Sequence, residues 1–223
     1  MIFKKEQLSE IIGQLHEDDV IVFPTDTVYG IGANIHSPIA LNKIFEVKNR
    51  PTDKSLIILC ANVMQMEEIV GPLDQQVKVL VDNFLPGGLT LILNTKLELA
   101  DEITRGKSTI GLRIPNHPVA LELLEKVGPL ATTSANISGE PSPTMIETSN
   151  PVISRVKFVI DDGETMEKVP STILDCTQSE IVILRQGAIS EEEIKKVLKN
   201  KVRCIILKKS SILSYQRKGW CLR

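Results

Sequence analysis

The sequence predicts an α/β fold, with helices covering one sheet, because apolar stretches of strand length alternate with amphipathic helical stretches. The connections are short, no internal repeat is present, and no linker is long enough to divide domains. With 223 residues, 42% hydrophobic and 24% charged, the chain has an ordinary globular composition. A chain of this length buries roughly 70% of its unfolded surface. One domain is therefore expected, and the alternation alone leaves the direction of each strand open.

The first strand is expected at residues 20–23, an apolar run that stops at Pro24 because proline has no N–H to donate to a sheet. The next helix takes Ser37 as its N-cap and Pro38 as its first residue, and it ends before Pro51. Later elements are bounded by similar signals, such as the turn at 86–88 and Ser190 as an N-cap. Further strands are expected at 56–60, 89–94, 109–114, 130–133, 156–160, 171–175 and 181–185, and further helices at 63–70, 74–83, 118–127 and 191–198.

Composition narrows the class of protein. The N-terminus has two lysines and an amphipathic pattern instead of the apolar core of a signal peptide, and no apolar run approaches about 18 residues. The four cysteines, at positions 60, 176, 204 and 221, are scattered without CxxC spacing, so neither a zinc site nor a disulfide framework is indicated. We therefore expect a cytoplasmic protein that does not span a membrane.

Charge is distributed unevenly along the chain. Residues 201–223 hold seven Lys and Arg and no Asp or Glu, which leaves 19 basic against 28 acidic residues, a formal charge of −9, in residues 1–200. Within this basic tail, 202–207 has the composition of a final strand, whereas 208–223 lacks periodicity. The tail is either a frayed terminus or an electrostatic contact for RNA.

Two familiar nucleotide motifs are incomplete. Gly30 opens a run like a dinucleotide-binding fingerprint, but Ile35 stands where Gly or Ala is required. The Gly-Lys-Ser at 106–108 resembles the end of a P-loop, but Asp101 replaces the earlier glycine and a strand follows. No serine lies in a GxSxG elbow, and the histidines show no triad or metal spacing, which favours surface or loop positions for His16, His36 and His117.

Residues 24–30, Pro-Thr-Asp-Thr-Val-Tyr-Gly, are the most informative segment. They follow a strand and precede a helix, and with Gly32 they offer hydroxyls, a carboxylate and close backbone approach. Open α/β sheets usually bind ligands where their strands end. A small-ligand loop is therefore expected here.

Cationic and hydroxyl residues recur where other elements stop. Lys48, Arg50 and Lys54 either hold a polyphosphate or complement the dipole of the helix that ends beside them. Arg113, in an apolar strand, needs a partner if it is buried, either a ligand carboxylate or an internal Asp or Glu. The Thr-Thr-Ser-Ala-Asn at 132–136 suits ligand contacts or an Asx turn.

Eight elements occur in order, at 24–32, 48–51, 54–56, 86–90, 111–115, 133–136, 171–175 and 184–187. This set strongly resembles the YrdC-like family over roughly residues 8–190. The resemblance implies a three-layer fold with a twisted mixed sheet and a basic concave active site. It also implies threonylcarbamoyl-AMP synthase activity, in which L-threonine, bicarbonate and ATP, with Mg²⁺, give threonylcarbamoyl-adenylate and pyrophosphate. The product serves the modification of ANN-decoding tRNA, so tRNA and the threonylcarbamoyl transferase complex are candidate partners.

The resemblance also assigns roles to residues of this chain. Lys48 is expected to contribute positive charge near the ATP phosphates. Lys48 and Arg50 are the candidates for electrostatic stabilisation in catalysis. The mechanism needs no protein nucleophile or protein metal ligand, because positioning and charge neutralisation carry it. The implied L-threonine contacts are Thr27, Arg113, Thr132 and Ser171, and the implied ATP contacts are Arg50, Lys54, Thr109, Ser134, Ser142 and Arg185.

Longer family members carry a further domain, so the chain is expected to be a short form: a catalytic domain at 1–200 and a basic tail at 201–223 that is one strand and then disordered. Two alternatives remain open. One is an RNA-binding or ribosome-associated module without catalysis, which the net acidic body and 4% aromatic content oppose. The other is carbamoyl transfer to a different acceptor.

Overall fold

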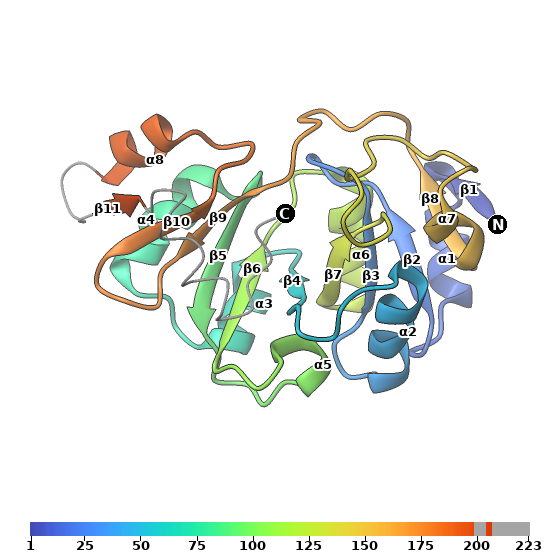
Figure 1. Ribbon diagram of the computed structural model, residues 1–223, viewed down its shortest axis with the longest axis horizontal. Helices are drawn as coiled ribbons and strands as arrows, with labels where there is room; N and C mark the ends of the chain where they lie inside the picture. The colour runs from blue at the N-terminus through green and yellow to red at the C-terminus, as the bar shows by residue number, and fades with distance from the viewer. Residues whose placement is uncertain (199–203, 207–223) are drawn as a thin grey trace.

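The computed structural model describes residues 1–198 and 204–206, and it contains one mixed sheet flanked by helices (Figure 1). Within these residues the sheet has eleven strands, in the order β1-β8-β2-β3-β7-β4-β6-β5-β9-β10-β11. The strands are β1 Ile2–Lys4, β2 Val20–Phe23, β3 Gly30–Asn34, β4 Ile57–Leu59, β5 Leu89–Asn94, β6 Thr109–Arg113, β7 Leu130–Ser134, β8 Phe158–Asp161, β9 Thr172–Asp175, β10 Ile181–Arg185 and β11 Cys204–Ile206.

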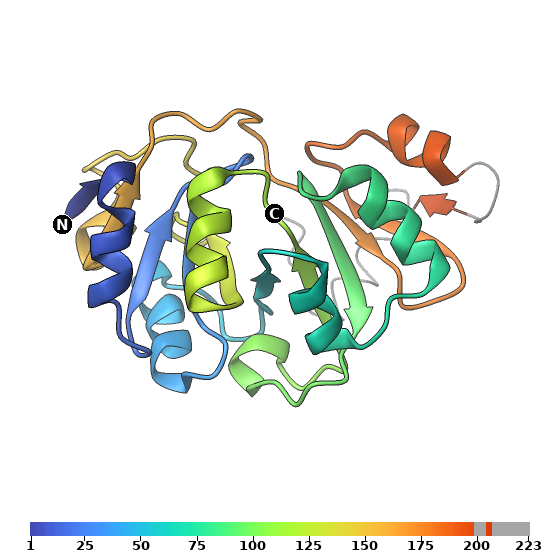
Figure 2. The same cartoon turned by 180° about the vertical axis from the view of Figure 1, so that it is seen from behind.

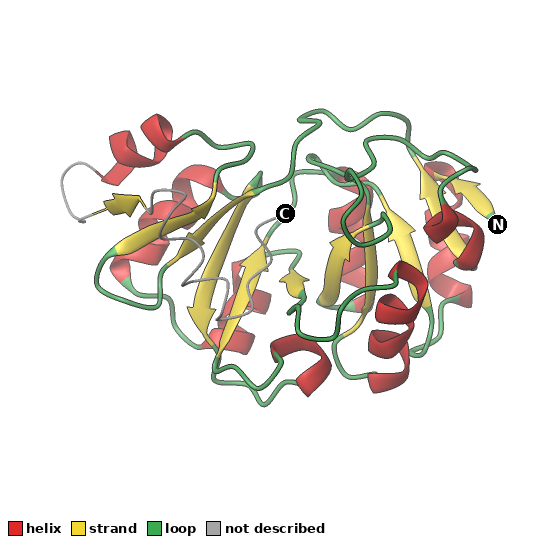
Figure 3. Cartoon of the chain, in the orientation of Figure 1, coloured by secondary structure: helices red, strands yellow, loops and turns green. Residues whose placement is uncertain are grey.

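The helices are η1 Lys5–Gln7, α1 Leu8–Gln14, α2 Pro38–Lys48, α3 Val63–Val70, α4 Gln75–Phe84, α5 Asp101–Thr104, α6 Pro118–Val127, α7 Pro151–Arg155 and α8 Glu191–Leu198 (Figure 3). Figure 2 shows α1, α6, α3 and α4 in front of the sheet, whereas α2 and α7 lie in front of it in the opposite view of Figure 1. The expected three-layer α/β architecture is therefore confirmed.

Strand direction is mixed. The pairs β1–β8, β2–β8, β4–β6, β5–β9 and β10–β11 are parallel, and the pairs β2–β3, β3–β7, β4–β7, β5–β6 and β9–β10 are antiparallel. This arrangement brings the ends of β6, β7 and β9 near the loop that follows β2. Strands far apart in the sequence thus present their ends to one place.

Two large apolar clusters and one small one, formed by Ile92, Ile173 and Leu184, pack against the sheet. The largest joins α2, α3, α4 and α8 to the central strands, with Leu41, Ile44 and Leu80 among its fully buried members. The second cluster places α1 and α6 over β1, β2 and β8, with Ile11 and Phe158 among its fully buried members. Burial of these side chains supplies the main stabilisation of the fold.

Most predicted elements are present within one or two residues of their expected bounds. Ser37 caps α2 by accepting a hydrogen bond from the Ala40 N–H at 3.0 Å, and Asn49 ends the helix in the left-handed conformation. Some strand ends differ from the predicted ones, because a residue belongs to a strand only where its backbone pairs with a neighbouring strand. The strand predicted at 56–60 is Ile57–Leu59, and the one predicted at 156–160 is Phe158–Asp161.

The expectation that Gly30 and Gly32 belong to a ligand loop was wrong. Both lie in β3, where they pair with Ser134 and Thr132 of β7. A Cβ on Gly32 would lie 2.9 Å from Cε1 of Phe23, so glycine is required by packing against β2. Two glycines among five residues weaken the sequence signal for a strand, so β3 was not predicted. The elements β1, α1, α5 and α7 were not predicted either, because they are short.

The basic tail is described only in part. Strand β11 lies inside the stretch expected at 202–207 and runs parallel to β10. The expected disorder of 208–223 lies outside the described residues. Among the residues that the structure describes, no helix combines the length and apolar character needed to cross a membrane.

Candidate active site

A cavity of about 510 Å³ opens where the ends of β6, β7 and β9 meet the loops after β2 and α2. Most of its lining residues are polar. Five of the lining side chains, Lys48, Arg50, Lys54, Arg113 and Arg185, are cationic, and among the described lining residues only Glu140 is a carboxylate. The hydroxyl residues of the lining are Thr25, Thr27, Ser55, Thr90, Thr132, Thr133, Ser134, Ser138, Ser142 and Ser171.

The loop at 24–29 is ordered by Thr25. Its Oγ1 donates to the Val28 carbonyl at 2.7 Å and accepts hydrogen bonds from the N–H groups of Thr27 and Val28. Outside contacts hold the loop as well, because Tyr29 N–H donates to the Pro143 carbonyl at 2.9 Å. The Thr27 side chain is thereby fixed beneath the cavity.

Arg113 extends from the end of β6 and is only 4% exposed. Its Nη2 donates to Oδ1 of Asp26 at 2.5 Å, its Nη1 to Oγ1 of Thr27 at 2.8 Å, and its Nε to the Gly87 carbonyl at 2.9 Å. The sequence left open whether this arginine meets an internal carboxylate or a ligand. Asp26 is the internal partner, and the side chain lines the cavity as well.

These bonds leave capacity for a ligand. A guanidinium carries five N–H groups, and three of them are used among the described residues. Burial lowers the pKa of Arg113, and the neighbouring Asp26 opposes that shift. Because an arginine keeps its proton at neutral pH, the group can bind a carboxylate in fixed orientation.

Lys48 ends α2 with its side chain 1% exposed. Its ammonium donates to the carbonyl of Asn136 at 2.5 Å and to that of Ser134. The lysine therefore ties the end of α2 to the turn after β7. Its charge also contributes to the positive potential of the cavity, since few carboxylates lie near.

Arg50 and Arg185 both line the cavity, although they lie far apart in the sequence. Arg50 Nη2 donates to the Ser55 carbonyl at 2.8 Å, which fixes the turn containing Lys54. Arg185 donates from Nε and Nη2 to the Ser171 carbonyl, and from Nη2 to Ser171 Oγ at 3.2 Å. Each guanidinium is thus oriented by backbone carbonyls while it faces the cavity.

Thr90 is a site residue that the sequence argument did not single out. It is fully buried, and its hydroxyl lies 2.8 Å from that of Ser171, across the parallel pair of β5 and β9. Because Thr90 lies in the motif at 86–90, the sequence alone could have indicated it as a site residue. Thr25, Asp26 and Asn136 were also not assigned roles, although all three lie in motifs quoted above.

The cavity brings together nine of the ten predicted substrate contacts and Lys48. Thr109 is absent from the lining: it begins β6, pairs with Asn94, and lies four residues, or about 13 Å along the strand, from Arg113. Its role stays a prediction. The residues brought together are Thr27, Lys48, Arg50, Lys54, Arg113, Thr132, Ser134, Ser142, Ser171 and Arg185.

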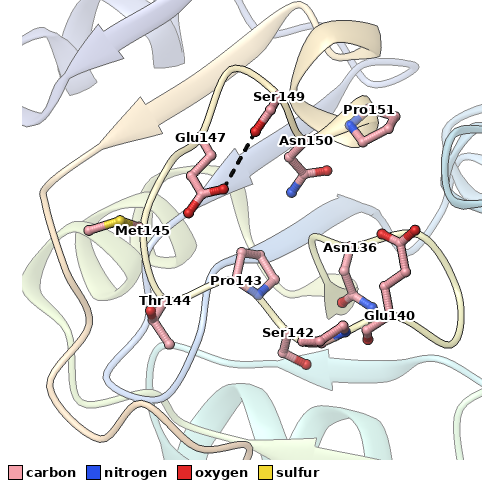
Figure 4. Close-up of a pocket in the computed structure, with 11 residues that line it drawn as sticks. Asn136, Glu140, Ser142, Pro143, Thr144, Met145, Glu147, Ser149, Asn150 and Pro151 are labelled. Atoms are coloured by element: carbon pink, nitrogen blue, oxygen red, sulfur yellow. Dashed lines mark hydrogen bonds between the residues drawn. The ribbon is translucent and has the colours of Figure 1, made fainter.

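A second cavity, of about 570 Å³, adjoins the first (Figure 4). Four residues line both: Asn136, Glu140, Pro141 and Ser142. The lining of the second cavity consists of loop residues between β7 and α7 and the start of α7. It has no lysine or arginine, in contrast to the first cavity.

The family model of Sua5, YciO and YrdC, described as "Telomere recombination", matches residues 13–187. The chain belongs to the Sua5/YciO/YrdC family. A similar family member is the threonylcarbamoyl-AMP synthase of Bacillus subtilis (strain 168), 42% identical over 195 residues, which covers 86% of this chain and 56% of that protein. The enzyme of the same name from Pyrococcus abyssi (strain GE5 / Orsay) is 40% identical over 188 residues, covering 83% of this chain and 55% of that one.

Solved structures of the Sua5/YciO/YrdC family agree in fold. The crystal structure of P. abyssi Sua5 complexed with L-threonine superposes with a TM-score of 0.84 at 36% identity, covering 92% of this chain and 62% of that one. The chain spans about half the length of the curated relatives named here. Fold and family are therefore shown, and the expected YrdC-like architecture is confirmed.

Proposed function

We propose that this protein is a threonylcarbamoyl-AMP synthase, a nucleotidyltransferase that uses L-threonine, bicarbonate and ATP. The observation that carries the proposal is the composition of the main cavity. A buried guanidinium with N–H groups to spare, Arg113, lies among hydroxyls, while Arg50, Lys54 and Arg185 add further positive charge. The names of the relatives and the threonine complex of P. abyssi Sua5 support it.

Threonine suits the Arg113 end of the cavity. Its carboxylate would accept from the two remaining N–H groups of the guanidinium. Its own hydroxyl can exchange hydrogen bonds with the side chains of Thr27, Thr132 and Ser171, all nearly fully buried. Leu59 and Ile57, which also line the cavity, offer apolar contact for the methyl group.

The chemistry needs positioning more than a protein nucleophile. The neutral amine of threonine forms a C–N bond with CO₂ derived from bicarbonate, and a proton leaves the nitrogen. A carbamate oxygen then bonds to the α-phosphorus of ATP, and the bond from that phosphorus to the β-phosphate oxygen breaks, so pyrophosphate departs with the electron pair. Lys48, Arg50, Lys54 and Arg185 offset the negative charge that concentrates in this step.

Mg²⁺ is expected to accompany ATP. This ion typically binds phosphate oxygens and water with only one or two protein carboxylates. The described residues hold no cluster of three or more potential metal ligands, and Glu140 supplies one carboxylate at the cavity. The donor set therefore fits an ion carried by the nucleotide, with Glu140 as the protein group able to contact it.

In this proposal residues 1–200 are the catalytic domain and residues 201–223 are a basic tail with a minor role. The enzyme would act in the cytoplasm. Its adenylate product would serve threonylcarbamoylation of ANN-decoding tRNA, by transfer through a threonylcarbamoyl transferase complex.

The decisive experiment is pyrophosphate release from ATP, Mg²⁺ and bicarbonate, with and without L-threonine, followed by mass detection of the adenylate. Release that requires both threonine and bicarbonate is expected. L-Serine, which lacks only the methyl group, and L-valine, which has a methyl group in place of the hydroxyl, are matched substrate controls. No release by folded protein would contradict the proposal, and tRNA binding would then be measured.

A further inference from the structure

Residues 162–170 form a strap that leads from the end of β8 to Ser171 at the main cavity. Figure 1 shows the strap in orange along the top of the view. Its side chains are mostly exposed, Met166 at 66%, but Thr165 is only 3% exposed. Thr165 does not line the cavity, whereas Pro170 at the end of the strap does. A single buried side chain in an exposed segment indicates a contact with the interior.

The strap holds two backbone carbonyls of the loop at 24–29. The Asp26 carbonyl accepts from the Glu167 N–H at 2.9 Å, and the Thr27 carbonyl accepts from the Thr165 hydroxyl at 2.9 Å. Thr27 is fully buried, so its carbonyl would be left without a donor if the Thr165 hydroxyl were removed. The conformation of the loop therefore depends on the strap.

The strap is itself anchored, which keeps the Thr165 hydroxyl in place. The Thr165 N–H donates to the Thr144 carbonyl at 2.8 Å, in the loop between β7 and α7. At the start of the strap, Tyr29 Oη accepts from the Asp162 N–H at 3.1 Å and donates to the Gly163 carbonyl at 2.7 Å. These bonds use backbone groups of the strap, so a substitution of the Thr165 side chain leaves them available.

Thr27 connects the strap to Arg113. Its Oγ1 accepts from Arg113 Nη1 at 2.8 Å, while its carbonyl accepts from Thr165. Asp26, whose carbonyl is also held by the strap, is the ion-pair partner of Nη2 of the same arginine. Both nitrogens at the tip of Arg113 thus bind residues whose backbone the strap fixes. A displacement of this backbone would turn the guanidinium.

We infer that Thr165 is a positioning residue for L-threonine: its hydroxyl fixes Thr27 and thereby the orientation in which Arg113 meets the carboxylate of the amino acid. The inference rests on the proposed function and adds to it a residue outside the cavity. The cations assigned to the phosphates are held elsewhere, Arg50 by the Ser55 carbonyl and Arg185 by that of Ser171. Thr165 therefore acts on threonine binding and not on ATP binding.

The test measures binding of L-threonine and of Mg²⁺–ATP separately, by calorimetry, on wild type and variants. Thr165→Val replaces the hydroxyl by a methyl group. It is expected to bind L-threonine about tenfold more weakly and Mg²⁺–ATP within about twofold of the wild type. Thr165→Ser keeps the hydroxyl and should restore threonine affinity to within about threefold. Thr95→Val is the matched control, because Thr95 also donates to a carbonyl, that of Leu97 at 2.8 Å, but lies outside the cavity.

Three outcomes would overturn the inference. They are unchanged threonine affinity of Thr165→Val, an equal loss of affinity for both ligands, and failure of Thr165→Ser to restore binding. An equal loss would mean that the hydroxyl supports the fold in general. If the wild type did not bind L-threonine, the proposed function would fail as well, whereas the three outcomes above leave that function intact.

Hydrogen exchange on the wild type tests the same coupling without a substitution. L-Threonine at saturation should slow amide exchange at Thr165 and Glu167 at least threefold, because a ligand that binds the ordered loop also stabilises the contacts that order it. The Lys96 amide, which donates to the Ile69 carbonyl outside the cavity, is the reference and should not change. Unchanged exchange at Thr165 and Glu167 in protein that binds L-threonine would overturn the inference.

Discussion

Arg113 and Asp26 form an ion pair in which Nη2 and Oδ1 lie 2.5 Å apart and the side chains are 5% and 3% exposed. The same Oδ1 accepts a hydrogen bond from the Asn116 N–H at 3.0 Å. Asp26 does not line the cavity, so it acts on a ligand only through the arginine. The pair therefore supplies a guanidinium that lines the cavity while an internal counter-charge and three hydrogen bonds hold it.

Asp26→Asn should lower the free energy of unfolding by about 3–5 kcal/mol, because it leaves a buried guanidinium without its counter-charge. Urea denaturation measures this change. The exposed pair of Lys168 and Glu164 is the matched control, since Glu164→Gln should cost less than about 1 kcal/mol. Equal effects of the two substitutions would show that burial of the Arg113 pair does not matter.

Much of this site could be anticipated because its residues lie beside strong local signals. Pro24 and Pro51 mark the ends of elements, and polar residues next to each of them line one cavity. Local patterns are reliable where a cap or a proline leaves few alternatives. The family resemblance then supplied the roles that position alone does not give.

The rest depended on contacts between distant segments. No local pattern pairs Asp26 with Arg113, 87 residues away, or Thr90 with Ser171. Strand β3 was not predicted because glycine is uncommon in strands. The reason for Gly30 and Gly32 is visible only in the structure, where Phe23 and Thr132 fill the space that a side chain at these positions would need.

Arg50→Ala should reduce adenylate formation at least a hundredfold while changing stability by about 1 kcal/mol. Its guanidinium lines the cavity, and its Nη2 donates to the Ser55 carbonyl. Pyrophosphate release and urea denaturation are measured on the same preparation. Arg155→Ala is the control, because Arg155 likewise donates to a backbone carbonyl, that of Val47, but lies outside the cavity. If the two variants had similar turnover, Arg50 would have no role in the reaction.

Stability should fall on mild acidification because of His117, which precedes α6. Burial lowers its pKa below the ordinary 6.5, whereas Asp162 and Asp26 raise it and Lys5 lowers it further. The unfolded chain therefore binds a proton at this residue before the folded chain does, so stability is fully present above pH 6.5 and is lost as the pH falls below it.

His117→Gln removes this titration. Urea midpoints of the wild type and the variant, measured at pH 8 and again between pH 6 and 5, should converge as the pH falls. A difference between the two proteins that is independent of pH would mean that His117 takes up its proton equally in both states.

Gly187 occupies a position that admits no side chain. A Cβ there would lie 2.2 Å from the Pro170 carbonyl oxygen and 2.6 Å from that of Ser171, the acceptor of Arg185. Gly187→Ala should therefore destabilise the protein by about 1–3 kcal/mol and weaken threonine binding, since Ser171 must move. Thermal unfolding and the KM for L-threonine are the measurements.

Gly13→Ala is its matched control. Gly13 lies in α1 with nothing within 4 Å of the added Cβ, so alanine should stabilise the helix by about 0.5–1 kcal/mol and leave the KM unchanged. The two substitutions add the same methyl group, and their opposite signs would come entirely from the surroundings. If Gly187→Ala kept wild-type stability and KM, the backbone at Pro170 and Ser171 would have room to yield, and the rigid support of Ser171 by Arg185 would have to be abandoned.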